Sequence, residues 1–165
     1  MKAPPLLVRF TRTLAFVLSA ASLQAETWHV FFGTGGPGAD GIYRSTFDTA
    51  TGKLSAATRA AASEGPGFLA LHPEGGRLYA VTSMDKTPVV AAYRVGAEGA
   101  LSLLGTSPIT DGGGAHIAVH PSGKFLLTAQ YGGGSVGLFP LDAEGRPGPV
   151  TITEHQGGSR VFERR

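Results

Sequence analysis

Apolar residues in this chain occur in short runs of strand length, and glycine and proline separate the runs. The clearest case is residues 113–141, whose runs HIAVH, KFLLTAQY and SVGLFPL show no helical period and therefore predict β-strands. The break at His120–Gly123 predicts a turn, because Pro121 fixes φ and Gly123 permits a positive φ. Three glycines at 132–134 predict the next turn. The segment therefore predicts an antiparallel meander.

The same pattern occurs earlier in the chain, at residues 67–95, which read GFLALHPEGGRLYAVTSMDKTPVVAAYRV. Its His-Pro-Glu-Gly, starting at His72, matches His-Pro-Ser-Gly, starting at His120, at an offset of 48 residues. A partial third copy aligns residues 47–55 with residues 93–102. A period of about 45 residues with four short strands per unit is typical of propeller blades. The sequence predicts an all-β fold, a β-propeller built from four-stranded antiparallel blades.

Turn residues divide the chain into about three predicted blades, at residues 27–64, 67–109 and 115–153. In the first blade, residues 53–61 predict the outer strand, although the alanines within 56–62 also fit a short helical turn. This blade has no inner strand of its own. A closed propeller needs at least four blades. We expect either a truncated product of a longer gene, which is favoured, or self-association through open blade edges.

The first 25 residues differ in composition from the rest of the chain. Basic residues but no acidic one precede Glu26, and residues 14–23 form an apolar run that is too short to span a bilayer comfortably. Small residues follow this run. The pattern predicts a secretory signal peptide at 1–25, a partial propeller at 26–165 and a periplasmic or secreted location. An uncleaved anchor is the alternative.

Loss of residues 1–25 changes the charge of the protein. It removes three basic residues and no acidic one, so the net charge goes from +2 to −1. The mature chain therefore has no basic bias of the kind that nucleic-acid-binding proteins show, and we expect no nucleic-acid partner and no membrane contact after cleavage. The chain has no cysteine, which excludes disulfides and thiolate metal sites.

Residues 33–38 satisfy the glycine spacing of a dinucleotide-binding loop, but their context does not. Such a loop needs a helix directly after it, whereas here Pro37 and a further strand-like run, IYRSTF, follow. We interpret the segment as a long connection between two antiparallel strands, and we predict no cofactor. No metal site is predicted either, because His116 and His120 on one strand would lie about 13 Å apart at about 3.3 Å per residue.

Five stretches of this chain, GIYRSTFD, PGFLALHP, GRLYAV, AHIAVHPSGKFLLTAQYGGGSV and HQGGSR, resemble the lactonase family of seven-bladed propellers. That family includes the propeller-type 6-phosphogluconolactonases and the fungal carboxymuconate cycloisomerases. The resemblance covers residues 27–165 and is strongest at 113–139. It implies about three blades of a probable seven, and hydrolysis of a sugar lactone such as 6-phosphogluconolactone at the mouth of the channel. We expect this chain on its own to be inactive.

The sequence departs from the family pattern at several positions. The family's opening Gly-Thr-Tyr-Thr is replaced by residues 33–36, its Asn-Glu in the second blade by Thr82 and Ser83, and the Asn of Ala-Asn-Tyr in the third blade by Gln130. The family's later Gln and His-x-His segment is absent. These losses favour the alternative of a non-catalytic secreted propeller that serves as a binding or envelope scaffold. The sequence does not separate lactonase from cycloisomerase.

Among the histidines, His116 is the predicted catalytic residue. His72 and His120 share one repeat position before proline, which indicates a structural role in the turn. His116 aligns instead with Phe68, follows three glycines and begins an inner strand. A histidine there can act as a general base or as an oxyanion donor. The alternative is a histidine bonded to the backbone of the neighbouring blade.

The predicted partner is a small-molecule lactone or sugar acid. Arg164 and Arg165 are candidates for binding its anionic group, because the family places an arginine near this point. Solvated charge at the chain end is the alternative. Tyr131 and Gln130 are further substrate-binding candidates, since they occupy the family's Tyr and Asn positions beside the glycine-rich turn, although such aromatics usually serve packing.

Overall fold

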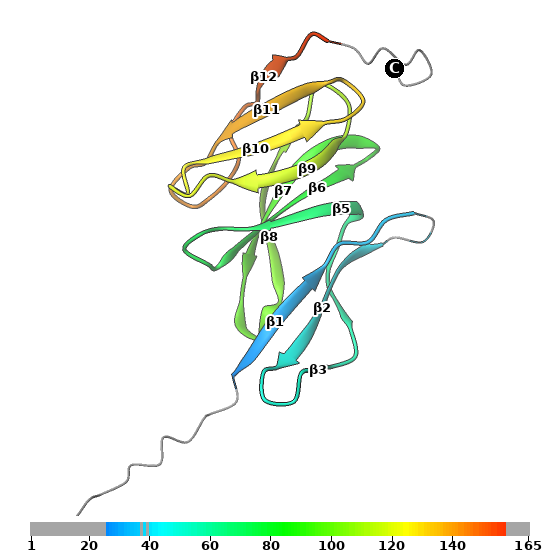
Figure 1. The fold of residues 1–165 in the computed structure, drawn as a ribbon, viewed down its shortest axis with the longest axis vertical. Coiled ribbons are helices and arrows are strands. Elements are labelled where there is room, and N and C mark those ends of the chain that lie inside the picture. Colours follow the sequence, from blue (N-terminus) through cyan, green and yellow to red (C-terminus); the bar gives the residue numbers. More distant parts are fainter. Residues whose placement is uncertain (1–25, 37, 39, 158–165) are drawn as a thin grey trace, which may run out of the picture.

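The computed structural model describes residues 26–36, 38 and 40–157. These residues form twelve β-strands and one short 3-10 helix, η1 (Ala97–Gly99). Figure 1 shows the strands as three sheets stacked along the long axis of the molecule, with the first sheet at the bottom and the third at the top. The predicted signal peptide at 1–25 lies outside the described residues. Within them, no helix has the length and apolar character needed to cross a membrane.

Each sheet is antiparallel and is built from consecutive strands. The first contains β1 (Thr27–Phe32), β2 (Gly41–Asp48), β3 (Lys53–Leu54) and β4 (Thr58–Ala62); the second β5 (Glu64–Leu71), β6 (Arg77–Met84), β7 (Thr87–Val95) and β8 (Leu101–Pro108); the third β9 (Gly114–Val119), β10 (Phe125–Gln130), β11 (Ser135–Pro140) and β12 (Thr151–Glu154). In the second and third sheets each strand pairs with the next one along the chain. This is the up-and-down order of a propeller blade, as the sequence predicts.

In the first sheet, β3 and β4 both pair with β2. Leu54 is opposite Phe47, and Ala61 is opposite Ile42, so the two short strands follow one another along the same edge of β2. The sheet therefore has three strand positions. The alanine-rich segment 58–62 is extended and not helical, because its backbone groups are bonded to β2.

The second sheet is buried on both faces, and β6 shows why. Its side chains alternate in direction, as in any strand. Leu78 and Ala80 join a cluster that faces the first sheet, whereas Tyr79 and Val81 join a cluster that faces the third. The partners in the third sheet are Ile117, Leu126 and Phe139, all nearly inaccessible to solvent. A continuous apolar run in β6 is thus what a central blade requires.

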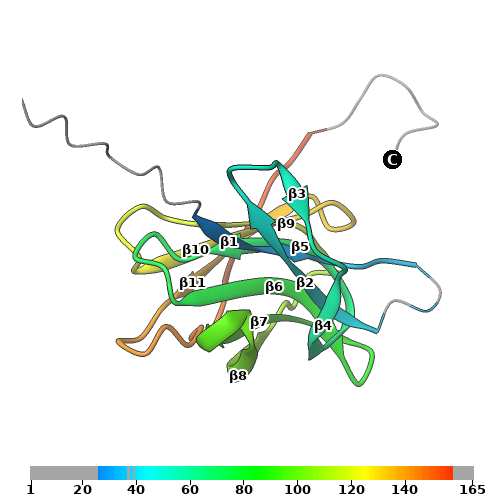
Figure 2. The same ribbon diagram turned by 90° about the horizontal axis from the view of Figure 1, so that it is seen from below.

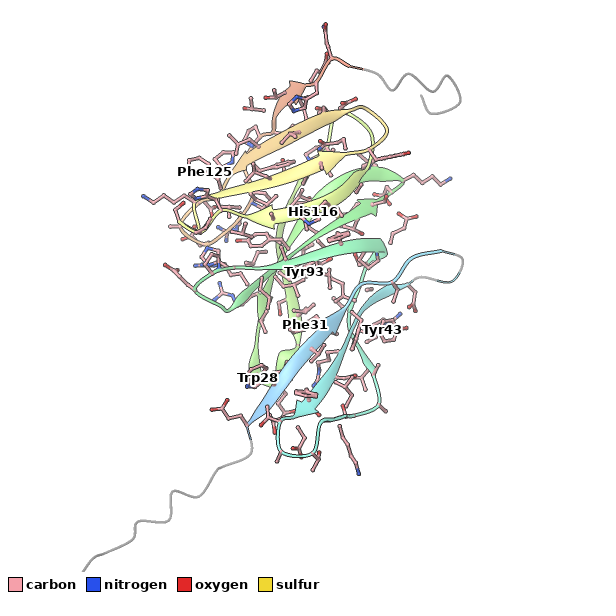
Figure 3. All side chains as sticks on the ribbon, in the orientation of Figure 1. Trp28, Phe31, Tyr43, Tyr93, His116 and Phe125 are labelled. Atoms are coloured by element: carbon pink, nitrogen blue, oxygen red, sulfur yellow. The ribbon has the colours of Figure 1, made fainter. Side chains whose placement is uncertain are left out.

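The two end sheets each expose apolar side chains on the face without a neighbour. Trp28 of the first sheet is 58% exposed, and Phe125 and Leu138 of the third are 40% and 38% exposed. Figure 3 shows Trp28 and Phe125 at opposite ends of the stack. These faces have the composition of blade interfaces and lack a covering sheet among the described residues.

His72 links the second sheet to the third. Its Nδ1 accepts a hydrogen bond from the Glu74 N–H at 3.2 Å, and its Nε2 lies 3.1 Å from the carbonyl oxygen of Gly123 in the next sheet. Gly123 has φ of +69°, and any Cβ there would meet the His72 ring. His120 makes the same turn contact, since its Nδ1 accepts from the Ser122 N–H at 3.2 Å. The shared repeat position therefore closes the turn, and in His72 it also joins two blades.

Candidate functional site

Five connections gather at one end of the stacked sheets, which we call the mouth end. They are the β1–β2 connection, the β4–β5 connection, the β6–β7 turn, the β8–β9 connection and the β10–β11 turn. Antiparallel pairing places them together, because alternate turns of a meander lie on the same side. The mouth end lies on the right in Figure 1, and Figure 2 shows the same molecule from below, with the β1–β2 connection again at the right. The inner strands β5 and β9 both begin here.

Gly114 brings the start of β9 close to the second blade. A Cβ at this position would meet the side chains of Val81 and Ile109, so only glycine allows this approach. The pairing of β9 with β10 also shifts by one residue at this point, between Ala129 and Gln130. The bulge and the close contact at Gly114 together determine how the β9 backbone leads into His116.

His116 lies two residues beyond Gly114, opposite Ala129 of β10. Its side chain is exposed, and no group among the described residues hydrogen-bonds its ring. The ring instead packs on Phe68 of β5, with centroids 4.6 Å apart and planes tilted by 53°. Figure 3 shows His116 between the second and third sheets. Among the described residues, His116 therefore makes no hydrogen bond to the backbone of the neighbouring blade, which was the alternative role for this histidine.

Asp111 is a candidate that sequence reasoning missed. It lies in the β8–β9 connection, and its carboxylate occupies the space where a side chain on Gly133 would be. Its Oδ2 atom is buried and has no hydrogen-bond partner among the described residues. A buried carboxylate oxygen without a partner is costly and calls for a water or a ligand. An acidic residue directly before three glycines at the mouth end is the signal that would have found it.

Of the four predicted substrate-binding residues, the structure describes Tyr131 and Gln130. Tyr131 is 93% exposed in the β10–β11 turn, at the mouth end. Gln130 is only 2% exposed; its Nε2 donates to Thr128 Oγ1 at 2.6 Å, and its Oε1 accepts from Ser135. The structure thus places Gln130 in the framework of the third blade. Arg164 and Arg165 lie outside the described residues.

Thr82, which replaces an asparagine of the family pattern, also belongs to the framework. It is 8% exposed, and its hydroxyl donates to the Glu64 carbonyl oxygen at 2.8 Å. The same hydroxyl lies 2.8 Å from Ser63 Oγ, which in turn accepts from the Tyr93 hydroxyl. This chain of hydroxyl groups fixes the connection from β4 to β5, so Thr82 is not free to meet a ligand.

Asp40, at the end of the β1–β2 connection, is likewise engaged. The Tyr43 hydroxyl donates to it at 2.7 Å and Arg59 at 2.8 Å. These contacts hold the pKa of Asp40 below its usual value, the hydrogen bond from Tyr43 being the main cause. Because both carboxylate oxygens have partners, Asp40 is a structural anion and not a candidate base.

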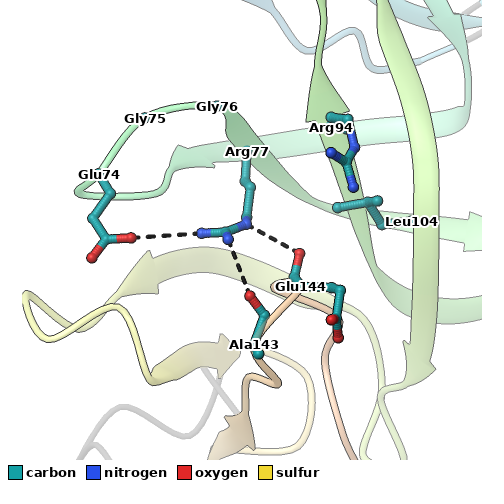
Figure 4. A pocket seen from close by; sticks show the side chains of 8 residues that line it. All are labelled: Glu74, Gly75, Gly76, Arg77, Arg94, Leu104, Ala143 and Glu144. Carbon is teal, nitrogen blue, oxygen red and sulfur yellow. Dashed lines mark hydrogen bonds and ion pairs between the residues drawn. The ribbon is translucent and has the colours of Figure 1, made fainter.

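A hollow of about 400 Å³ lies at the end of the sheets opposite the mouth end, between the second and third sheets (Figure 4). Arg77 dominates it. Its Nε donates to the Glu144 carbonyl oxygen at 3.0 Å and its Nη2 to that of Ala143 at 3.2 Å, while Nη1 lies 3.9 Å from Glu74. Since backbone oxygens already occupy its donors, Arg77 acts as a connector between blades and leaves little for an anionic ligand.

The described residues contain no group of three or more potential metal ligands among His, Asp and Glu side chains. The segment 33–38, with its dinucleotide-like spacing, connects the antiparallel strands β1 and β2. It therefore lacks the helix that would present backbone N–H groups to a pyrophosphate.

Comparison with known proteins identifies a family and several relatives that match most of the chain. Residues 29–165 match the family described as "Lactonase, 7-bladed beta-propeller". The chain is 32% identical over 122 residues to a 6-phosphogluconolactonase of Bacillus subtilis, a match that covers 73% of this chain and 35% of that relative. The chain thus spans about a third of the length of this curated relative.

Solved structures show the same partial coverage. A Bacteroides uniformis protein proposed to be a 6-phosphogluconolactonase superposes with a TM-score of 0.74 at 28% identity, over 82% of this chain and 40% of that one. A periplasmic gluconolactonase of Pseudomonas aeruginosa superposes with a TM-score of 0.72 at 24% identity, over 79% of this chain and 39% of that one. The predicted fold is confirmed: the chain is all-β, and its four-stranded antiparallel sheets are propeller blades.

Proposed function

This chain belongs to the lactonase family of seven-bladed β-propellers. We propose that it contributes His116, at the mouth end of its blades, to a site that hydrolyses a sugar lactone. The observation that carries the proposal is the exposed imidazole of His116 at the mouth end, which has no hydrogen-bond partner among the described residues. The similarity to a 6-phosphogluconolactonase supports a six-carbon sugar lactone as the substrate class.

The chemistry requires a base and an oxyanion donor. His116 takes a proton from a water molecule while that water attacks the lactone carbonyl carbon. The carbonyl oxygen becomes an oxyanion in the tetrahedral intermediate, and donors near it lower the barrier. The bond between carbonyl carbon and ring oxygen then breaks, and the imidazolium returns its proton to the ring oxygen. The product is the open hydroxy acid. Tyr131, exposed in the β10–β11 turn, is proposed to contact the sugar.

A non-catalytic scaffold is the second candidate, and two residues favour it. Thr82 and Gln130 stand where the family pattern has asparagine, and both are buried and hydrogen-bonded within the blades. If the asparagines at these positions bind substrate in the family, Thr82 and Gln130 have lost that role here and instead stabilise the blades. The assay below distinguishes the two functions.

The test is lactone hydrolysis by two proteins. One is this chain alone, for which we expect a rate no higher than spontaneous opening, because three sheets leave the mouth open on one side. The other is a seven-bladed chimaera, in which residues 26–157 are joined to the part of the Bacillus subtilis relative that this chain does not match. We expect it to hydrolyse glucono-1,5-lactone or its 6-phosphate. Robust hydrolysis by this chain alone would show that the site is complete in three blades.

A folded chimaera that binds the lactone without hydrolysing it would favour the second candidate function, a non-catalytic binding scaffold.

We also propose that the protein is exported, because basic residues and a short apolar run precede Glu26, as in a secretory signal peptide. The expected mature protein begins between Ser22 and Thr27, since cleavage must remove the apolar segment and leave the first strand intact. Mass measurement of protein from the periplasm or medium checks this. Exported protein that retains residues 1–25 would contradict cleavage, and protein found solely in the cytoplasm would contradict export.

A further inference from the structure

The imidazole of His116 is held by an aromatic neighbour. Catalytic histidines are commonly oriented by a hydrogen bond to one ring nitrogen. Here no group among the described residues makes that bond, and the Phe68 ring lies against the imidazole at 4.6 Å. We infer that Phe68 is the positioning residue for His116, and that the exposed part of its ring forms, with the imidazole, a platform for the apolar face of a cyclic polyhydroxylated ligand. This inference rests on the proposed function.

The contact follows from the blade repeat. Phe68 and His116 occupy equivalent positions, 48 residues apart, on inner strands of adjacent blades. Both positions follow an irregularity in the pairing of the inner strand: β5 resumes regular pairing at Phe68, opposite Val81, and β9 shifts just before His116. Gly114 then allows β9 to approach Val81 itself. The same small set of backbone features therefore brings the two rings together.

An aromatic contact suits a base that must exchange protons. A tilted pair of rings is more favourable than the burial of its area alone, so the contact favours one orientation of the imidazole. Unlike a hydrogen bond, the contact occupies neither ring nitrogen. Both nitrogens of His116 therefore remain available to a water molecule and to the substrate.

The platform also defines a ligand class. Phe68 is 44% exposed, so part of its ring faces solvent beside the imidazole. The electron-rich face of an aromatic ring attracts the C–H groups of a bound molecule. A sugar lactone presents C–H groups on the face of its ring and hydroxyl groups at its edge. Such a ring can stack on Phe68 and place its carbonyl edge toward His116.

The positioning part is tested by NMR on the chain as it is, without ligand. The ring protons of His116 should be displaced by the ring current of Phe68. Phe68→Leu should move these signals to those of an ordinary exposed histidine, whereas Phe68→Tyr should preserve the displacement. Leu71→Ala is the matched control, because Leu71 is an exposed apolar residue of the same strand. Unchanged His116 signals in Phe68→Leu would overturn the positioning role.

The ligand part is tested with D-glucono-1,5-lactam, a ring of the same shape that is not hydrolysed as the lactone is. Saturation transfer should pass from aromatic protons of the protein to C–H protons of the lactam, and Phe68→Leu should weaken binding about 2- to 10-fold, as loss of an aromatic contact of this size predicts. Equal binding by wild type and Phe68→Leu, or no binding by either, would overturn the platform.

Turnover in the chimaera separates this inference from the proposed function. Phe68→Leu should lower kcat more than it raises KM, and Phe68→Tyr should restore kcat. If His116→Ala abolishes turnover while Phe68→Leu changes neither kcat nor the His116 signals, the proposed function stands and the positioning role fails. If Phe68→Leu moves the signals while His116→Ala keeps full turnover, the contact is real and the proposed catalytic role of His116 fails.

Discussion

Replacing His116 with alanine in the seven-bladed chimaera is expected to reduce lactone turnover by roughly 100-fold or more, as loss of a general base or an oxyanion donor does. The substitution should leave the melting temperature nearly unchanged. The His116 side chain is exposed and outside both apolar clusters, so the blade packing does not depend on it.

The matched control for this substitution is His120→Ala. His120 is also an exposed histidine of the third blade, but it lies in the β9–β10 turn at the opposite end, where its Nδ1 contacts Ser122. We expect it to keep wild-type turnover. Steady-state kinetics on the two variants, with a thermal melt of each, make the comparison. Wild-type turnover in His116→Ala would show that the base comes from another residue or another blade.

Phe139→Ala is expected to have the largest effect on stability, a loss of about 3–5 kcal/mol in the free energy of unfolding. The Phe139 ring is fully buried between the second and third sheets, beside Tyr79 and Leu126. Its removal leaves a cavity that neighbouring strands cannot close, because their backbones are tied to one another by ladder hydrogen bonds. Since domains are stable by about 5–15 kcal/mol, this loss removes a large part of the total.

Phe125→Ala provides the comparison within the same sheet. Phe125 begins the neighbouring strand β10, but it lies on the outer face and is 40% exposed. We expect a loss smaller than about 1 kcal/mol in the isolated chain, because the Phe125 side chain is already partly exposed and belongs to neither buried apolar cluster. Urea denaturation of the two variants measures the difference. Equal losses would mean that the outer face of the third sheet is covered in solution.

The blade repeat shows which features of the candidate site could be predicted from the sequence and which could not. The mismatch between His116 and Phe68 in the repeat drew attention to His116, which the structure has on the inner strand β9; its catalytic role stays a prediction. The same alignment did not show that the two rings touch, because a repeat offset gives equivalence between blades and not the distance between them. The family likeness suggested Gln130, but the structure shows its amide turned into the hydrogen bonds of its own blade.

The sequence by itself determined the strands, the turns and their repetition in blades. Strands and turns depend on local features, because short apolar runs and the Pro and Gly residues between them act within a few residues of one another. The blades were recognisable because the same local pattern recurs about every 45 residues. The close contact of Phe68 with His116, the burial of Gln130 and the position of Asp111 against Gly133 were decided by tertiary structure alone. These three features depend on how whole sheets and their connections pack together. That packing involves side chains far apart in the chain, so local sequence patterns do not predict it.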